Sequence, residues 1–124
     1  MQTQKLTDKQ KVLLEILNQI FEIGKKLSKI REPNSIARNL NTLEGLFKTK
    51  LYEAEQGGFF IEDPIGTKYD ETRLDCEASI AGESTENLHI VEVIKPIIRY
   101  KQGGYNDLMQ KAVVIVQSKI ENRV

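Results

Sequence analysis

The chain has 124 residues, enough for one ordinary domain or two small modules, and this length excludes a large enzyme. It carries 18 basic and 18 acidic residues, so no net charge attracts nucleic acid or an anionic membrane. No apolar run approaches the roughly 20 residues that span a bilayer, and residues 1–11 are polar where a secretory signal would be apolar. We therefore expect a folded cytoplasmic protein that binds neither nucleic acid nor a membrane.

Cys76 is the single cysteine and His89 the single histidine. This excludes an internal disulfide and argues against a thiolate-imidazole zinc site within one chain. The usual catalytic motifs are absent from the sequence. Turns and exposed sheet faces commonly carry acidic residues, so we do not interpret four such residues as a carboxylate pair or metal site: Asp63, Asp70, Asp75 and Glu77. The sequence therefore predicts no enzyme, cofactor or metal, and a buried, unreactive Cys76.

Two helices are predicted before residue 58. Thr7 and Gln10 match a capping box, so the first helix should begin near residue 8. Apolar residues then recur at steps of three and four until about Ile30, after which Pro33 interrupts the pattern. The same spacing resumes at Ile36 and ends at the glycines at 57 and 58. Because the connection is short, we expect the helices to pack as an antiparallel hairpin.

The apolar faces of these helices look too broad for a single neighbour. Burying each leucine or isoleucine is worth about 1.5–3 kcal/mol, so a lone hairpin would leave much apolar surface uncovered. Two copies around a dyad would complete a four-helix bundle. We therefore expect a homodimer with this interface: Leu13, Leu17, Ile20, Phe21, Leu27, Leu40, Leu43, Phe47 and Leu51. The alternative is that the rest of the chain folds back over the helices within one molecule.

The apolar period changes from helical to strand-like after Gly58. The sequence thus predicts an α+β fold, with a helical dimerisation region over residues 1–57 and a small mainly-β domain over 58–124. Strands are expected at 59–62, 74–80, 88–94, 97–101 and 112–116. Pro96 should interrupt the sheet because it has no N–H to donate. A turn is expected at Gly103-Gly104, with Asn106-Asp107 continuing it.

Three stretches of this second region follow one another in an order that indicates a family. They read Asp63-Pro64-Ile65-Gly66-Thr67-Lys68-Tyr69-Asp70, then Ile90-Val91-Glu92-Val93-Ile94, then Gln110-Lys111-Ala112-Val113-Val114-Ile115-Val116. In this order, after two helices, they resemble the β-domain of the GrpE family, the nucleotide exchange factors of DnaK-type chaperones. The resemblance implies the same fold for the region from residue 58 onward.

The resemblance also implies a function without chemistry, in which the β-domain docks on the ATPase domain of a DnaK-type chaperone and favours release of ADP. By motif position, the docking face would include Glu71, Ile94, Asp107 and Val116. A supporting turn would be shaped by Gly66, Tyr69 and Asp70. The alternative is a dimeric adaptor that keeps the scaffold without exchange activity. It is suggested by Gln110, where an arginine is usual, and by the short stretch before the first helix, which leaves no room for the family's long stalk helix.

Overall fold

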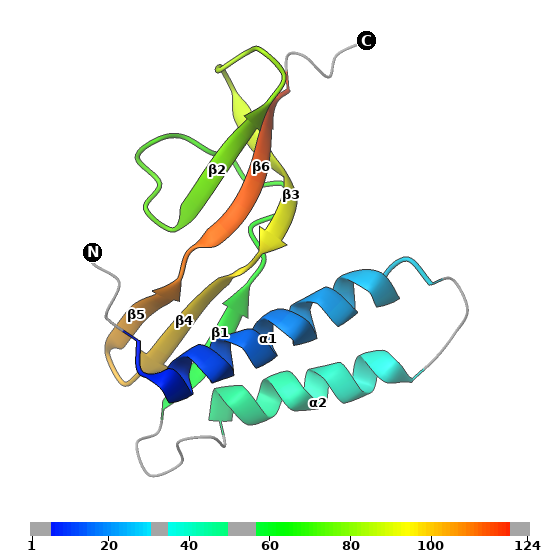
Figure 1. Ribbon diagram of the computed structural model, residues 1–124, viewed down its shortest axis with the longest axis vertical. Helices are drawn as coiled ribbons and strands as arrows, with labels where there is room; N and C mark the ends of the chain where they lie inside the picture. The colour runs from blue at the N-terminus through cyan, green and yellow to red at the C-terminus, as the bar shows by residue number, and fades with distance from the viewer. Residues whose placement is uncertain (1–5, 31–34, 50–56, 120–124) are drawn as a thin grey trace.

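The computed structural model describes residues 6–30, 35–49 and 57–119, which adopt an α+β fold (Figure 1). Two helices, α1 (Asp8–Leu27) and α2 (Ile36–Thr49), lie side by side at one end of the molecule (Figure 1). Six strands follow within the described residues: β1 (Gly57–Glu62), β2 (Cys76–Ala81), β3 (Leu88–Lys95), β4 (Ile97–Gln102), β5 (Tyr105–Gln110) and β6 (Ala112–Ser118). They form two three-stranded sheets, β1-β4-β5 and β2-β6-β3. The α+β class predicted from the sequence is confirmed.

The first helix begins as predicted and ends slightly earlier. Gln10 N–H donates to the Thr7 hydroxyl at 3.1 Å, and Thr7 N–H donates to the Gln10 side-chain carbonyl at 2.9 Å, which confirms the capping box. The helix ends at Leu27 rather than near Ile30. The residues between form a hydrogen-bonded turn, in which Ile30 N–H donates to the Leu27 carbonyl at 3.0 Å.

The second helix begins at Ile36, as predicted, and is described to Thr49. Its predicted continuation, including the dimer residue Leu51, lies outside the described residues, as does the predicted break at Pro33. Each of the five predicted strands is present, although the first two residues of the strand predicted at 74–80 are loop and β2 begins at Cys76. One strand, β5, was not predicted.

Pro96 interrupts the sheets as predicted, because β3 ends immediately before it and β4 begins immediately after it. The prediction that Asn106 and Asp107 continue the preceding turn is wrong. These residues belong to β5 and pair with Lys101 and Tyr100 of β4. Gly103, with φ of +56°, and the glycine after it close the hairpin by themselves, so the polar pair is free to enter the strand.

The helices and the β1-β4-β5 sheet share one hydrophobic core, which crosses the predicted boundary at residue 58. Its buried residues come from α1, α2 and all three strands of that sheet: Leu14, Leu17, Ile20, Leu40, Phe59, Ile98 and Met109. Leu17, Ile20 and Leu40 were expected at a dimer interface. They are instead buried within the chain, because the sheet covers the inner side of the helices.

A second core lies mainly within the β2-β6-β3 sheet and the segments around it. Its buried residues are Cys76, Leu88, Ile90, Val93, Ile97, Leu108, Ala112, Val114 and Val116, with Phe21 and Tyr69 packed against them. Cys76 is 6% exposed, which confirms that it is buried.

Polar side chains fix α1 where the two sheets meet. Asn18 and Gln110 exchange two amide hydrogen bonds of 3.0 and 2.8 Å, and Gln110 also donates to the Pro96 carbonyl at 2.9 Å. The Lys25 ammonium donates to the Val93 carbonyl at 2.7 Å. Because buried amides are costly to leave unpaired, these bonds set the position of α1 on the sheets.

Candidate functional site

Within the part of the chain that the structure describes, one face of the β2-β6-β3 sheet has no helix against it, because α1 and α2 lie mainly by the β1-β4-β5 sheet (Figure 1). Along β6, Val114 and Val116 are buried, whereas Val113 and Ile115 are only half-buried and point to the opposite side. The strand partner of Val113 in β2 is Glu77. This side of the sheet, which we call the open face, therefore places an apolar middle strand beside exposed polar neighbours.

Two irregularities in β3 add apolar side chains to the open face. The register shifts between Ile90 and Glu92, and again between Val93 and Lys95, so Val91 and Ile94 are extra residues in the pairing with β6. Their side chains are 43% and 44% exposed. Bulges commonly redirect a side chain in this way. The apolar part of the open face thus comprises Val91, Ile94, Val113 and Ile115, framed by Glu77, Glu92 and Lys95.

The structure does not bring the four predicted docking residues together. Ile94 is exposed on the open face, and Glu71 is exposed in the loop before β2. Asp107 belongs to β5, in the other sheet. Val116 is fully buried, because β6 is the central strand and its even-numbered residues form the core. Val116 is therefore not available to a partner in this fold.

Sequence reasoning missed three residues of the open face, the exposed Val91 and the half-buried Val113 and Ile115. For Val113 and Ile115 a signal was present, because Ala112 at the start of the strand sets the alternation. Val91 carried no such signal, since a bulge depends on the pairing of two strands and not on one of them.

The turn expected to support the docking face is tied to β3. Two backbone N–H groups donate to β3 carbonyls at 2.9 Å: Gly66 to Ile90, and Tyr69 to Leu88. Gly66 has φ of +80°, a conformation that glycine adopts without strain. Asp70 lies at the end of this anchored stretch and is exposed. The predicted role of Gly66 and Tyr69 in shaping a turn is consistent with these bonds.

A network of ion pairs joins the two sheets. Asp75 lies between Arg73, at 2.8 Å, and Arg99, at 3.4 Å, and Arg99 also pairs with Glu62 at 3.0 Å. Burial alone would raise the pKa of Asp75, but the hydrogen bond and charge of Arg73 hold it below its usual value. Burial raises the pKa of the adjacent Cys76 thiol to about 11, so this thiol stays protonated at neutral pH.

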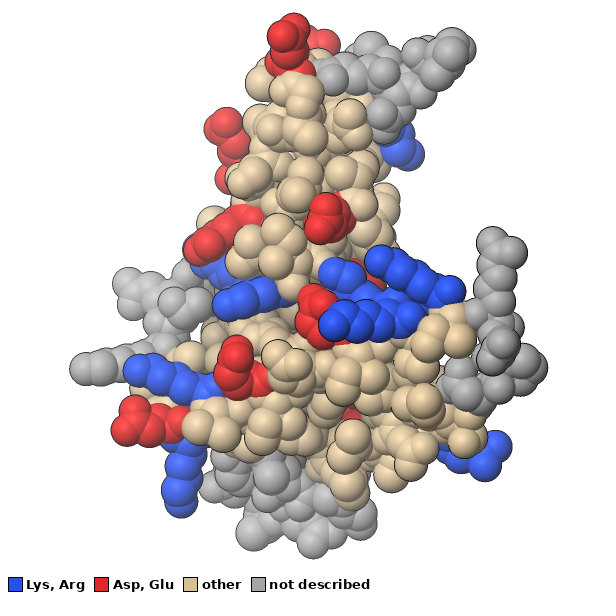
Figure 2. All heavy atoms as spheres, turned by 45° about the vertical axis from the view of Figure 1, so that its right-hand side comes forward, with Lys and Arg blue, Asp and Glu red and all other residues tan. Residues whose placement is uncertain are grey.

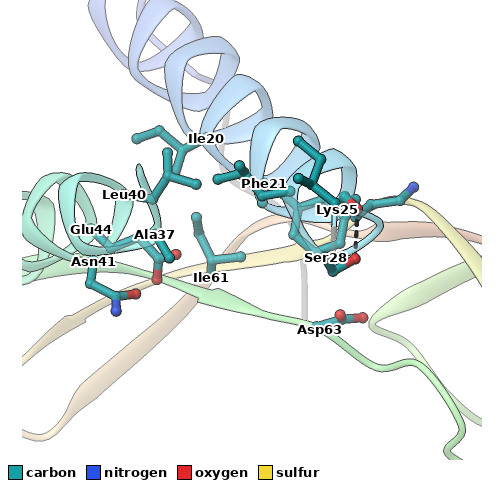
Figure 3. Close-up of a pocket in the computed structure, with 13 residues that line it drawn as sticks. Ile20, Phe21, Lys25, Ser28, Ala37, Leu40, Asn41, Glu44, Ile61 and Asp63 are labelled. Atoms are coloured by element: carbon teal, nitrogen blue, oxygen red, sulfur yellow. Dashed lines mark hydrogen bonds between the residues drawn. The ribbon is translucent and has the colours of Figure 1, made fainter. Parts of the chain in front are cut away.

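The described residues contain no group of three or more His, Cys, Asp or Glu side chains placed to hold a metal ion. A hollow of about 760 Å³ lies between α1, α2 and β1 (Figure 3). Ile20, Phe21, Leu40 and Ile61 surround it, whereas the Lys25 ammonium turns away toward β3 (Figure 3). It is a groove over the helix–sheet core, and the polar part of its lining comes from Ser28, Asn41, Glu44 and Asp63 (Figure 3).

Each of the two helices also leaves apolar side chains uncovered, and we call this set of residues the outer stripe. It consists of side chains that are 42–59% exposed: Val12, Ile16 and Ile23 on α1, and Ile36, Leu43 and Leu46 on α2. Their spacings of three, four and seven place them on one side of each helix. Of the predicted dimer residues, Leu43 belongs to this stripe. Four others are half-buried against the chain's own cores: Leu13, Phe21, Leu27 and Phe47.

None of the helices in the described ranges is both long and apolar enough to cross a membrane. Comparisons with protein-family models, curated proteins and solved structures found no significant match to this chain.

Proposed function

We propose that this chain is a non-catalytic protein-binding factor that docks on a partner protein through the open face of its β2-β6-β3 sheet. The observation that carries the proposal is the apolar strip formed by Val91, Ile94, Val113 and Ile115, which lies in a frame of charged residues. Contiguous apolar patches with polar rims are typical of protein interaction sites. On the resemblance to GrpE, the partner is the ATPase domain of a DnaK-type chaperone and the result of docking is release of ADP.

Such an exchange factor needs no reacting groups, only a difference in affinity. It must bind the open nucleotide cleft more tightly than the closed one, and by linkage ADP must then weaken its binding. Ile94 supports this version of the proposal, because the family motif assigns it to the docking face and its side chain is 44% exposed on the open face.

The test is release of fluorescent ADP from a DnaK-type ATPase domain, with and without this protein. We expect faster release, and loss of the acceleration in Ile94→Glu and Ile115→Glu, which place a charge in the apolar strip. Leu74→Glu is the matched control, because Leu74 is 61% exposed but lies in the loop before β2. Equal acceleration by all variants would refute the open face as the docking surface.

A second candidate function, an adaptor without exchange activity, is favoured by three positions. Val116 is buried, Asp107 belongs to the other sheet and Glu71 lies in the loop before β2, so three of the four docking residues implied by the resemblance are not on the open face. An adaptor would form a complex through the open face and leave the rate of ADP release unchanged. Failure to find any complex with the ATPase domain would point to a different partner.

We also propose that the chain forms a homodimer through the outer stripe, so that four helices pack together. The inner sides of the helices are already covered by the β1-β4-β5 sheet, which leaves the outer stripe as the apolar surface for a second copy. We expect a dimer in sedimentation equilibrium, and at least a tenfold weaker dimer in Ile16→Glu and Leu43→Glu, equivalent to about 1.4 kcal/mol. Leu74→Glu should leave the dimer intact. A wild-type monomer at high protein concentration would refute this interface and leave the monomeric alternative.

A further inference from the structure

A second hollow, of about 450 Å³, lies on the opposite side of the β2-β6-β3 sheet from the open face. We call it the distal hollow. Its apolar lining comes from Tyr69, Ala78, Ile80 and Leu88. Ile80 pairs with the buried Val116, yet its own side chain is 47% exposed. The core side of the sheet therefore becomes accessible at this edge.

The distal hollow lies beside an edge of the sheet. In the order β2-β6-β3, β2 has a single neighbouring strand among the described residues. Ile80, which is exposed, thus belongs to an edge strand of this sheet. Edge strands with accessible apolar side chains are common places for another protein segment to bind.

The charged side chains near the distal hollow indicate which kind of protein segment suits it. Residues 63–92, which include every residue that lines the distal hollow, contain eight acidic and two basic side chains, a net charge of −6 in a chain whose total is zero. Two of the acidic residues, Glu77 and Glu92, belong to the open face on the other side of the sheet. Arg73, one of the two basic residues, is already paired with Asp75. In Figure 2, red side chains predominate over the upper part of the molecule and most blue side chains lie below it.

Two of these carboxylates line the distal hollow itself, those of Asp70 and Glu71. The hydroxyl and the backbone N–H of Thr72 both donate to Asp70, and these bonds lower the pKa of its carboxyl group. Asp70 is therefore ionised at neutral pH. Lys68 is the single cation among the residues that line the hollow.

We infer that the distal hollow receives an arginine or lysine side chain from a partner protein. The aliphatic stem of such a side chain would lie over Ala78 and Ile80, and its cationic end would meet Asp70 and Glu71. Arginine suits the site better, because its planar group binds a carboxylate through two parallel hydrogen bonds. The inference deepens the proposed function, since it supplies a second, charge-selective contact for the same β-module.

The test uses the ¹⁵N-labelled full chain and three short peptides, titrated while amide shifts are recorded. The probe is acetyl-Leu-Arg-Leu-amide. Its control, acetyl-Leu-citrulline-Leu-amide, has nearly the same shape without the charge. We expect saturable shifts at residues 69–71, 78–80 and 85–88, with at least tenfold weaker binding of the citrulline peptide. Acetyl-Leu-Glu-Leu-amide should not bind. Binding of the arginine peptide should weaken as the salt concentration is raised, because the peptide's arginine and the carboxylates of the distal hollow are exposed to solvent.

Two charge-matched variants complete the test. Glu71→Gln should weaken the arginine peptide at least threefold, whereas Glu77→Gln, which removes the same charge from the open face, should leave its affinity unchanged. Three results would each overturn the inference. They are equal binding of the arginine and citrulline peptides, equal effects of the two variants on peptide affinity, and amide shifts at residues away from the distal hollow.

The outcomes are separable from those of the ADP-release assay. Peptide binding without accelerated release would support the basic-side-chain site and reject exchange activity. Accelerated release without peptide binding at the distal hollow would support exchange and reject the site.

Discussion

The two sheets of this protein have the same number of strands but opposite surroundings. The β1-β4-β5 sheet is covered by two helices, and Phe59 and Ile98 in it are 2% and 0% exposed. The β2-β6-β3 sheet buries one side only, and Val91 on its other side is 43% exposed. Similar apolar, strand-forming residues are thus buried on the core side of both sheets, whereas on the open face of the β2-β6-β3 sheet they stay accessible to solvent. Burial on the core side stabilises the fold, and the open face presents its apolar residues at the surface.

The largest expected effect tests this contrast directly. Phe59→Ala should lower the free energy of unfolding by about 3–5 kcal/mol, because it leaves a cavity in a closed core. It also removes the edge-to-face contact with the Tyr100 ring, whose centroid lies 5.2 Å from that of Phe59. Ile115→Ala, on the half-buried open face, should cost about 1 kcal/mol or less. Urea unfolding measured for both variants gives the comparison. If Ile115→Ala loses much unfolding free energy only when the protein concentration is high, a second copy covers the open face.

A smaller effect concerns the ion pairs that connect the two sheets. Asp75→Asn should destabilise the protein by about 2 kcal/mol at pH 7, because the Arg73 and Arg99 guanidinium groups lose their shared carboxylate. The folded-state pKa of Asp75 is lowered, so the wild type has this stability above the ordinary aspartate pKa of about 4 and loses it at lower pH.

The check is thermal unfolding of wild type and Asp75→Asn from pH 7 down to pH 2. The difference between them should shrink as the pH falls through the folded-state pKa of Asp75. A difference that stays constant over this range would show that the carboxylate charge is not what connects the sheets.

The smallest effect probes the side of α2 that faces away from the sheet. A Cβ added at Gly45 meets no atom within 4 Å, so Gly45→Ala should stabilise the protein by about 1 kcal/mol through helix propensity. The same substitution at Gly103, where φ is +56°, should destabilise it instead. Thermal unfolding distinguishes stabilisation by the first substitution from destabilisation by the second. A loss of stability in Gly45→Ala would indicate that this side of α2 packs against something, such as a second copy.

Most elements could be predicted because their signals are local. The capping box at Thr7, the break at Pro96 and the apolar strand at 112–116 each depend on a few neighbouring residues. The strand β5 was missed because Asn106 and Asp107 favour turns on their own, and pairing with β4 overrides that preference.

The candidate site was predicted only in part. Ile94 proved exposed, whereas Val116 proved buried, and the exposed residue at the bulge, Val91, had no local signal. Which side of a strand is covered depends on the elements that pack against it, and the motif positions did not contain that information.

The sequence by itself determined where both helices and most of the strands lie, and that both helices have a broad apolar side. Only the tertiary structure decided that the inner part of that side is covered by β1, β4 and β5, that β6 runs between β2 and β3, and that one face of this sheet stays open. The reason is physical. Periodicity follows from the local backbone geometry of a helix or a strand, whereas strand order and burial depend on contacts between residues far apart in the chain.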